Sequence, residues 1–181
     1  MKLFLVRHTT PDISKDVCYG QSDLNLVANF GIEIEKVQSL LGDTHYGKVY
    51  SSPLFRCMTL ARTLVPESDQ VSLDDRLMEF NFGDWEMKTW KEIEKTPEAK
   101  AWFADYIQTP VPGGESFTQL IDRVQDFINE LKKNPDDDDV LIVTHLGVIR
   151  AFSVIIKQID AKAAFDLHVG YGDLHEMELK T

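Results

Sequence analysis

The sequence predicts an α/β protein with three layers, in which helices cover both faces of a mainly parallel central sheet. One observation supports this fold class, and a second indicates a single domain. Short apolar strands alternate along the chain with amphipathic helices, which is typical of parallel sheets whose strands are joined by helices. No internal repeat or linker divides the 181 residues, and this length suits a single apolar core, so we expect one domain over residues 1–181.

The first half of the chain contains three predicted strands and two predicted helices. Lys2–Arg7 is a short apolar strand, and apolar residues from Leu24 to Leu41 then recur at helical spacing. Val49–Ser51 is the second strand. Ser52-Pro53 follows it, with Ser as the expected N-cap and Pro at the first position of a helix. Val71–Leu73 is a brief third strand.

The second half begins with an irregular segment and continues with regular elements. Glu79 to Pro112 is irregular and rich in aromatic residues. Ser116 and Gln119 then have the spacing of a capping box, which predicts the start of a helix. The regular elements follow in the order helix, strand, helix, strand, at Phe117–Leu131, Val140–Thr144, Leu146–Ile156 and Leu174–Leu179.

Composition and charge exclude several classes of protein. Apolar residues make up 43% and charged residues 27% of the chain, which indicates a globular protein. The net charge of −11 argues against nucleic acid or an anionic membrane as a partner. No apolar run reaches the ~18 residues of a membrane helix, and Leu3–Val6 is shorter than the roughly 7–15 apolar residues of a signal peptide. We therefore expect a cytoplasmic protein.

The sequence does not indicate a metal or a disulfide framework. Cys18 and Cys57 stand far apart without a CxxC pattern, and His168 and His175 form no HxH or HxxxH pair. The acidic run Asp136–Asp139 follows Asn-Pro and precedes a strand, so we expect a solvated turn there.

Four basic side chains are predicted to meet at one edge of the sheet, provided that the strands before His8 and His145 are neighbours. His8 follows the first strand, and His145 follows the strand Val140–Thr144 and opens a helix. Arg7 precedes His8, and Arg56 lies in the first turn of the helix that follows the second strand. In open α/β sheets, ligands bind at the carboxyl ends of the strands, where helix N-termini also offer free N–H groups. Two arginines and two histidines there suit a phosphoryl group and its oxygens.

The chain resembles the histidine phosphatase superfamily, also called the phosphoglycerate mutase-like family. Five segments resemble its motifs, occur in the family's order and together cover nearly the whole chain: Leu5–Thr9, Ser51–Arg56, Leu77–Glu86, Pro112–Ser116 and Val143–His145.

The resemblance implies a role for each site residue. His8 corresponds to the nucleophile that becomes phosphohistidine, and Arg7, Arg56 and His145 correspond to the phosphate-binding residues. Glu79 corresponds to the acid that protonates the leaving oxygen and later to the base for water, with Glu86 as the alternative acid. Neutral imidazole is a good nucleophile near pH 7, and fixed positive charge stabilises the transition state without a metal or other cofactor.

Three departures from the family pattern leave some phosphate contacts open. The Asn and Ser contacts that the family usually has downstream of the nucleophile are replaced by the stretch from Pro11 to Ser14. Thr9 stands where the family usually has glycine after the nucleophile, and Leu146 stands where glycine is common, although Gly147 follows. Contacts from Thr9, Ser14 or Gly147 to phosphate are therefore not decided by the resemblance.

A further resemblance concerns the substrate, a small phosphorylated metabolite. Cys18-Tyr19-Gly20-Gln21-Ser22-Asp23 is similar to an element of the α-ribazole-5′-phosphate phosphatases of cobalamin biosynthesis. It implies that Tyr19, Gly20 and Gln21 contribute to substrate binding, with Phe82 and Trp85 as further candidates. Tyr171 is another aromatic candidate, and the alternative is that these rings belong to the core.

Other functions remain open at this point. A phosphatase of a sugar or glycerate phosphate is one alternative. A phosphoglycerate mutase is disfavoured because the mutases of the family usually have extra segments between Glu79's motif and the turn that corresponds to Pro112–Ser116. In this chain that interval is short. A catalytically weak module that binds phosphorylated ligands is an alternative of another class. The sequence does not indicate an oligomeric state.

Overall fold

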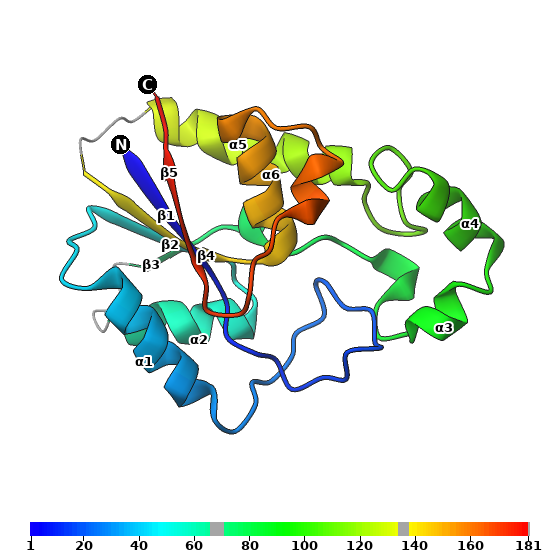
Figure 1. The fold of residues 1–181 in the computed structure, drawn as a ribbon, viewed down its shortest axis with the longest axis horizontal. Helices are drawn as coiled ribbons and strands as arrows, with labels where there is room; N and C mark the ends of the chain where they lie inside the picture. Colours follow the sequence, from blue (N-terminus) through cyan, green and yellow to red (C-terminus); the bar gives the residue numbers. More distant parts are fainter. Residues whose placement is uncertain (66–70, 134–137, 181) are drawn as a thin grey trace.

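The computed structural model describes residues 1–65, 71–133 and 138–180 (Figure 1). Its five-stranded sheet has the order β3-β2-β4-β1-β5. The β2–β3, β2–β4 and β1–β4 pairs are parallel, and β5 is antiparallel to β1, which confirms the mainly parallel sheet. The strands are β1 (Lys2–Arg7), β2 (Lys48–Ser51), β3 (Val71–Leu73), β4 (Val140–Thr144) and β5 (Leu174–Glu178).

Helices cover both faces of this sheet, which confirms the three layers (Figure 1). Successive strand side chains point to opposite faces: Leu3 and Leu5 of β1 pack into one apolar cluster, while Phe4 and Val6 pack into another. The first cluster includes residues of α5 and α6, and the second includes residues of α1 and α2. The bounds of these helices are Phe30–Leu41 (α1), Phe55–Leu64 (α2), Phe117–Lys133 (α5) and Leu146–Lys157 (α6).

The aromatic segment in the middle of the chain extends to one side of the sandwich, at the right of Figure 1. It contains α3 (Trp90–Ile93) and α4 (Pro97–Ala104). Thr89 and Thr96 cap these two helices with their side chains, so local capping starts helices that the aromatic composition did not indicate. Single 3₁₀ turns occur at Asp75–Leu77, Gly83–Trp85 and Ala163–Asp166.

The expected helix from Leu24 was wrong at its beginning, because α1 starts at Phe30. Leu26 forms a β-bridge with Pro11, and the backbone N–H of Val27 donates to the carbonyl of Thr10 at 3.2 Å. The apolar spacing continues upstream of Phe30, but the backbone there pairs with a distant loop instead of with itself.

The expected cap of the second helix was also wrong. This helix starts at Phe55, and the carboxylate of Asp23 accepts its first N–H at 2.8 Å. The hydroxyl of Ser52 instead lies 2.8 Å from Nε2 of His145. This hydroxyl also accepts the N–H of Leu54 at 3.3 Å, one residue before the helix, whereas the first helical N–H goes to the distant Asp23. Arg56 does lie in the first turn, as expected.

Other local expectations were confirmed. Ser116 and Gln119 form both hydrogen bonds of the capping box at the start of α5, and β5 ends one residue before the expected Leu179. The acidic run Asp136–Asp139 falls partly outside the described residues, so the turn expected there is not tested. No helix of the described chain is both long enough and apolar enough to cross a membrane.

Candidate active site

The carboxyl ends of β1 and β4 bring the two histidines together. Arg7 is in register with Thr144, so His8 and His145 leave neighbouring strands at the same level. The backbone N–H of His8 donates to the carbonyl of Thr144 at 3.0 Å. The imidazole rings have centroids 5.0 Å apart. The strand order therefore produces the convergence that the sequence suggested.

His8 is buried and its ring is oriented by the backbone. The side chain is 1% exposed, and Nδ1 lies 2.7 Å from the carbonyl oxygen of Thr9. A carbonyl only accepts hydrogen bonds, so Nδ1 carries the proton and Nε2 keeps its lone pair. Burial lowers the pKa of His8 well below its ordinary value, and the charge of Arg56 lowers it further. His8 is thus a neutral imidazole with a free nucleophilic nitrogen.

Arg7 and Arg56 are held by backbone carbonyls. Arg7 donates to the carbonyl of Val169 at 2.6 Å, and its guanidinium lies 3.9 Å from the ring centroid of Tyr171. Arg56 is fully buried and donates to the carbonyl of Ser22 at 2.9 Å. Within the described residues, neither arginine forms an ion pair with a carboxylate. Their charges therefore remain available to an anion.

His145 is as fully enclosed as Arg56. It is fully buried at the N-cap position of α6, and its Nε2 lies 2.8 Å from Oγ of Ser52 and 3.3 Å from Sγ of Cys57. Burial lowers its pKa, and the charge of Arg56 adds to the effect. The sequence contained Ser52 in a motif but did not indicate this contact.

Glu79 reaches the N-terminus of α6. Its Oε1 accepts the N–H of Gly147 at 3.0 Å and that of Phe80 at 2.9 Å. A Cβ at position 147 would lie 2.4 Å from this oxygen, so a larger residue there would displace the carboxylate of Glu79. Behind it, Arg123 donates to the carbonyl of Glu79 at 3.0 Å and pairs with Glu115 at 2.8 Å. Sequence reasoning missed this supporting pair.

The other candidates for polar roles lie in different surroundings. The carboxylate of Glu86 accepts N–H groups of the 20–22 backbone, whereas that of Glu79 accepts those of Gly147 and Phe80. The hydroxyl of Thr9 is buried without a hydrogen-bond partner among the described residues, beside His8. Ser14 donates to Asp16 in an exposed segment. Of the open phosphate contacts, Thr9 and Gly147 thus stand next to the site.

A cavity of about 240 Å³ opens beside Arg7, Glu79 and Gly147. Of the aromatic candidates for substrate binding, Tyr19 and Phe82 line it, whereas Trp85 does not: its side chain is 3% exposed and packs against Trp102. Gly20, Gln21 and Tyr171 also lie outside the lining, although the hydroxyls of Tyr171 and Tyr19 are 2.8 Å apart. The aromatic rings in the lining are Tyr19, Phe80, Phe82, Trp90, Trp102, Tyr106, Phe117 and Phe165.

Two cations of this cavity were missed from the sequence. Lys15 and Arg150 line it together with Arg7, and Glu79 is its carboxylate. Arg150 donates to the carbonyl of Phe165 at 2.8 Å, so it is held in the same way as Arg7. It lies three residues after Gly147 on α6, a spacing that places both on one helix face and was a usable signal. This gathering of cations explains how a chain of net charge −11 keeps a local site for an anion.

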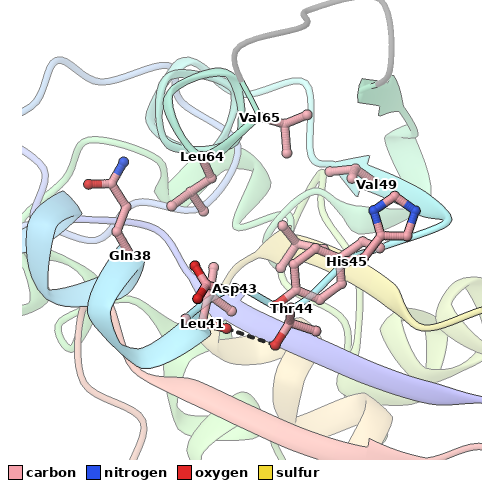
Figure 2. Close-up of a pocket in the computed structure, with 11 residues that line it drawn as sticks. Gln38, Leu41, Asp43, Thr44, His45, Val49, Leu64 and Val65 are labelled. Carbon is pink, nitrogen blue, oxygen red and sulfur yellow. Dashed lines mark hydrogen bonds between the residues drawn. The ribbon is translucent and has the colours of Figure 1, made fainter.

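A second cavity, of about 750 Å³, has a different character. Figure 2 shows it between the end of α1, β2 and the end of α2, with Leu41, Val49, Leu64 and His45 in its lining. Its described lining contains no lysine or arginine and none of the site residues above. It is therefore not a candidate for phosphate.

Among the described residues, no group of three or more His, Cys, Asp or Glu side chains is arranged to hold a metal ion.

The two buried histidines predict a pH-dependent loss of stability. Because both folded-state pKa values are lowered, the unfolded chain takes up protons below its ordinary pKa of ~6.5 that the native state does not bind. The contribution of these two histidines to the free energy of unfolding is present above pH ~6.5. It is lost as the pH falls, by up to about 1.4 kcal/mol per pH unit for each histidine.

Urea unfolding at pH 7.5 and pH 5.5 measures this loss. The His8→Asn variant should lose less stability than the wild type over this interval. A matched His168→Asn variant, which alters an exposed histidine, should behave like the wild type. Equal pH dependence of His8→Asn and wild type contradicts the assignment of a buried neutral His8.

Comparisons with known proteins give a consistent result. The family model described as histidine phosphatase superfamily (branch 1) matches residues 3–181. The adenosylcobalamin/alpha-ribazole phosphatase of Escherichia coli K12 is 27% identical over 176 residues, covering 95% of this chain and 87% of that protein. Phosphoserine phosphatase 1 of Hydrogenobacter thermophilus is 28% identical over 164 residues, covering 88% and 78%. The crystal structure of the alpha-ribazole phosphatase from Shigella flexneri superimposes with a TM-score of 0.89 at 25% identity, covering 99% and 91%.

Proposed function

Because the chain belongs to the histidine phosphatase superfamily, we propose that it hydrolyses small phosphomonoesters through a phosphohistidine formed on His8. The observation that carries this proposal is the neutral, oriented imidazole of His8 beside Arg7, Arg56 and His145. The proposal takes residues 1–181 as one cytoplasmic catalytic domain that needs no metal or other cofactor.

In the first step, Nε2 of His8 attacks phosphorus, so that a P–N bond forms and the P–O bond to the leaving group breaks. Glu79, in its protonated form, donates a proton to the leaving oxygen. Arg7, Arg56 and His145 bind the phosphoryl oxygens and stabilise the charge of the transition state. The buried hydroxyl of Thr9 is available for a further contact.

In the second step, water attacks the phosphohistidine. Glu79 removes a proton from this water, the P–N bond breaks, and inorganic phosphate leaves. His8 returns to its neutral form with the proton still on Nδ1, because Nδ1–H donates a hydrogen bond to the carbonyl of Thr9 throughout. The second step thus restores the enzyme for another cycle.

We propose α-ribazole 5′-phosphate as the substrate. Its leaving group carries a flat dimethylbenzimidazole on a ribose, and the cavity beside Arg7 and Glu79 is lined by aromatic rings. Stacking on an aromatic residue such as Tyr19 or Phe82 contributes ~0.5–1.5 kcal/mol beyond burial of area. The similarity to the alpha-ribazole phosphatase of E. coli supports this choice and the place in cobalamin biosynthesis that it implies.

A second candidate is a phosphomonoester with an acidic leaving group, such as a glycerate phosphate or phosphoserine. Arg150 and Lys15 favour it, because these cations line the same cavity beyond Arg7 and a carboxylate there gains charge-assisted hydrogen bonds. The similarity to a phosphoserine phosphatase of H. thermophilus supports this alternative.

A substrate panel measured in buffer with EDTA distinguishes these proposals. We expect kcat/KM to be highest for α-ribazole 5′-phosphate among that ester, AMP, 3-phosphoglycerate, phosphoserine and fructose bisphosphate. Tyr19→Ala should lower kcat/KM for the ribazole ester by about 10-fold, which corresponds to ~1.4 kcal/mol of lost stacking and burial. The same change should have little effect on phosphoserine, which has no ring.

Three other results have clear meanings. A clear preference for 3-phosphoglycerate or phosphoserine, lost in Arg150→Gln, establishes the second candidate in place of the first. Transfer of phosphate between glycerate positions indicates a mutase. Failure to turn over even p-nitrophenyl phosphate, although phosphate binds, indicates a binding module and contradicts the phosphatase proposal.

A further inference from the structure

The segment Gly20–Asp23, here called the arginine loop, surrounds Arg56. The guanidinium donates to the carbonyl of Ser22 at 2.9 Å and to the carbonyl of Gly20. At the other end of the loop, the carboxylate of Asp23 accepts the N–H of Phe55, the residue before Arg56, at 2.8 Å. One loop therefore holds both the side chain and the helix start that position this arginine.

The arginine loop is itself held by Glu86. The two carboxylate oxygens accept the backbone N–H groups of Gly20, Gln21 and Ser22 at 3.0, 2.9 and 3.1 Å. They also accept the hydroxyl of Ser22 at 2.6 Å and the N–H of Phe82 at 3.2 Å. Within the described chain, Glu86 forms no ion pair with a lysine or arginine. Its hydrogen-bond partners are thus this loop and the backbone beside it.

One peptide unit connects Glu86 directly to Arg56. The N–H of Gln21 donates a hydrogen bond to the carboxylate of Glu86, and the carbonyl of Gly20 accepts one from the guanidinium of Arg56. Both groups belong to the peptide unit between Gly20 and Gln21. A negative charge at the N–H end and a positive charge at the carbonyl end both stabilise this orientation of the peptide dipole, and linked hydrogen bonds strengthen one another.

The packing leaves the loop little freedom at this point. A Cβ on Gly20 would lie 1.8 Å from the carbonyl oxygen of Phe80 and 2.9 Å from Glu86. Cys18 before the loop is also buried, at 1% exposure. Glycine at this position therefore allows the backbone to lie directly between Glu86 and Arg56.

We propose that Glu86 is a positioning residue, which orients the guanidinium of Arg56 toward the phosphoryl group through the Gly20–Gln21 peptide unit. The proposal rests on the phosphate-binding role proposed above for Arg56. It assigns the Gly20–Asp23 part of the loop to holding the phosphate site, and leaves Tyr19 as the residue of this segment that lines the leaving-group cavity. It also separates Glu86 from the general-acid role, which needs contact with the leaving oxygen.

The change Glu86→Gln tests this role. The amide keeps one acceptor oxygen but turns an NH₂ group toward backbone donors, so the loop loses part of its support. We expect inorganic phosphate to inhibit about 10- to 100-fold less tightly, which is the size of a lost hydrogen bond to a charged group. The value of kcat/KM should fall by a similar factor for an aryl phosphate and for an alkyl phosphate alike, because no proton transfer is removed.

A double-mutant cycle with Arg56→Lys shows whether the effect passes through the arginine. Lysine lacks the planar fork that two carbonyls and a phosphate require. The loss caused by Glu86→Gln should therefore largely disappear in the Arg56→Lys background, as coupled residues are not additive. Glu92→Gln is the matched control, because the carboxylate of Glu92 accepts the N–H and the hydroxyl of Thr89 and has, in the part of the chain that the structure describes, no hydrogen bond to the arginine loop, and it should match the wild type.

The outcomes are separable. Additive losses, or a loss confined to the alkyl phosphate, overturn the positioning role of Glu86. Wild-type activity and phosphate binding in Arg56→Lys contradict the role proposed for Arg56 itself. If Glu86→Gln does not fold, Ser22→Ala removes one of the same hydrogen bonds from a smaller side chain. It should weaken phosphate inhibition about 2- to 5-fold, again only when Arg56 is present, and its failure to do so counts against the proposal.

Discussion

The variant His8→Ala is expected to lose phosphatase activity by about 10⁴–10⁶-fold, because the nucleophile acts as a unit with the groups that bind the transferring phosphoryl. The geometry behind this expectation is the Nε2 lone pair, which the hydrogen bond between Nδ1 and the carbonyl of Thr9 leaves free. Rapid-quench labelling with ³²P-substrate should detect an acid-labile, base-stable phosphoprotein in the wild type and none in the variant.

Two controls make this result interpretable. His168→Ala changes an exposed histidine and should retain both labelling and turnover. His8→Asn keeps a polar side chain in the buried position and tests whether a loss in His8→Ala reflects unfolding. Near-normal turnover in a folded His8→Ala protein would exclude the phosphohistidine mechanism.

The variant Glu79→Gln is expected to lower kcat for an alkyl phosphate by about 10²–10⁴-fold, the usual contribution of general acid–base catalysis. Its KM should change less, because Glu79 contacts the N–H groups of Gly147 and Phe80 instead of holding phosphate. For p-nitrophenyl phosphate the first step should be nearly unaffected, since this leaving group needs no proton. A pre-steady-state burst measures that step separately from hydrolysis of the phosphoenzyme.

The comparison with Glu86→Gln provides the matched control for this prediction. Both changes replace a carboxylate by an amide, and the two residues lie seven positions apart in one motif. Glu79→Gln should discriminate between leaving groups, whereas Glu86→Gln should not. If the discrimination belongs to Glu86→Gln instead, the assignment of the acid is reversed.

Several features of the site could be predicted because they depend on which segments are strands and on their parallel direction. Residues that follow parallel strands meet at one edge of the sheet, so the positions of His8, His145 and Arg56 could be inferred once β1, β4 and β2 were recognised as strands. The middle of β1 and nearly all of β4 are apolar and β-forming, and the five family-like motifs agree with the three strands.

Local patterns failed where long-range contacts competed with them. The apolar spacing at Leu24 and Val27 suits a helix, but the backbone there pairs with Thr10 and Pro11. Ser52 is a residue type that favours the N-cap, yet its hydroxyl contacts His145 and the N–H of Leu54, and Asp23 accepts the first N–H of the helix. Each competing partner lies far away in the sequence, so no window of neighbouring residues contains the information.

The sequence by itself determined the three-layer fold, the family and the four basic residues at the sheet edge. Strands, helices and motifs can each be recognised from residues that lie close together in the sequence. Only the tertiary structure decided what surrounds them. It showed that Glu79 and Glu86 have different hydrogen-bond partners. It also showed that Trp85 is buried outside the cavity lining, and that Lys15 and Arg150 belong to this lining. The physical reason is that cavity walls and backbone hydrogen bonds between loops arise from packing of segments distant in the chain, and local propensity does not encode which loops meet.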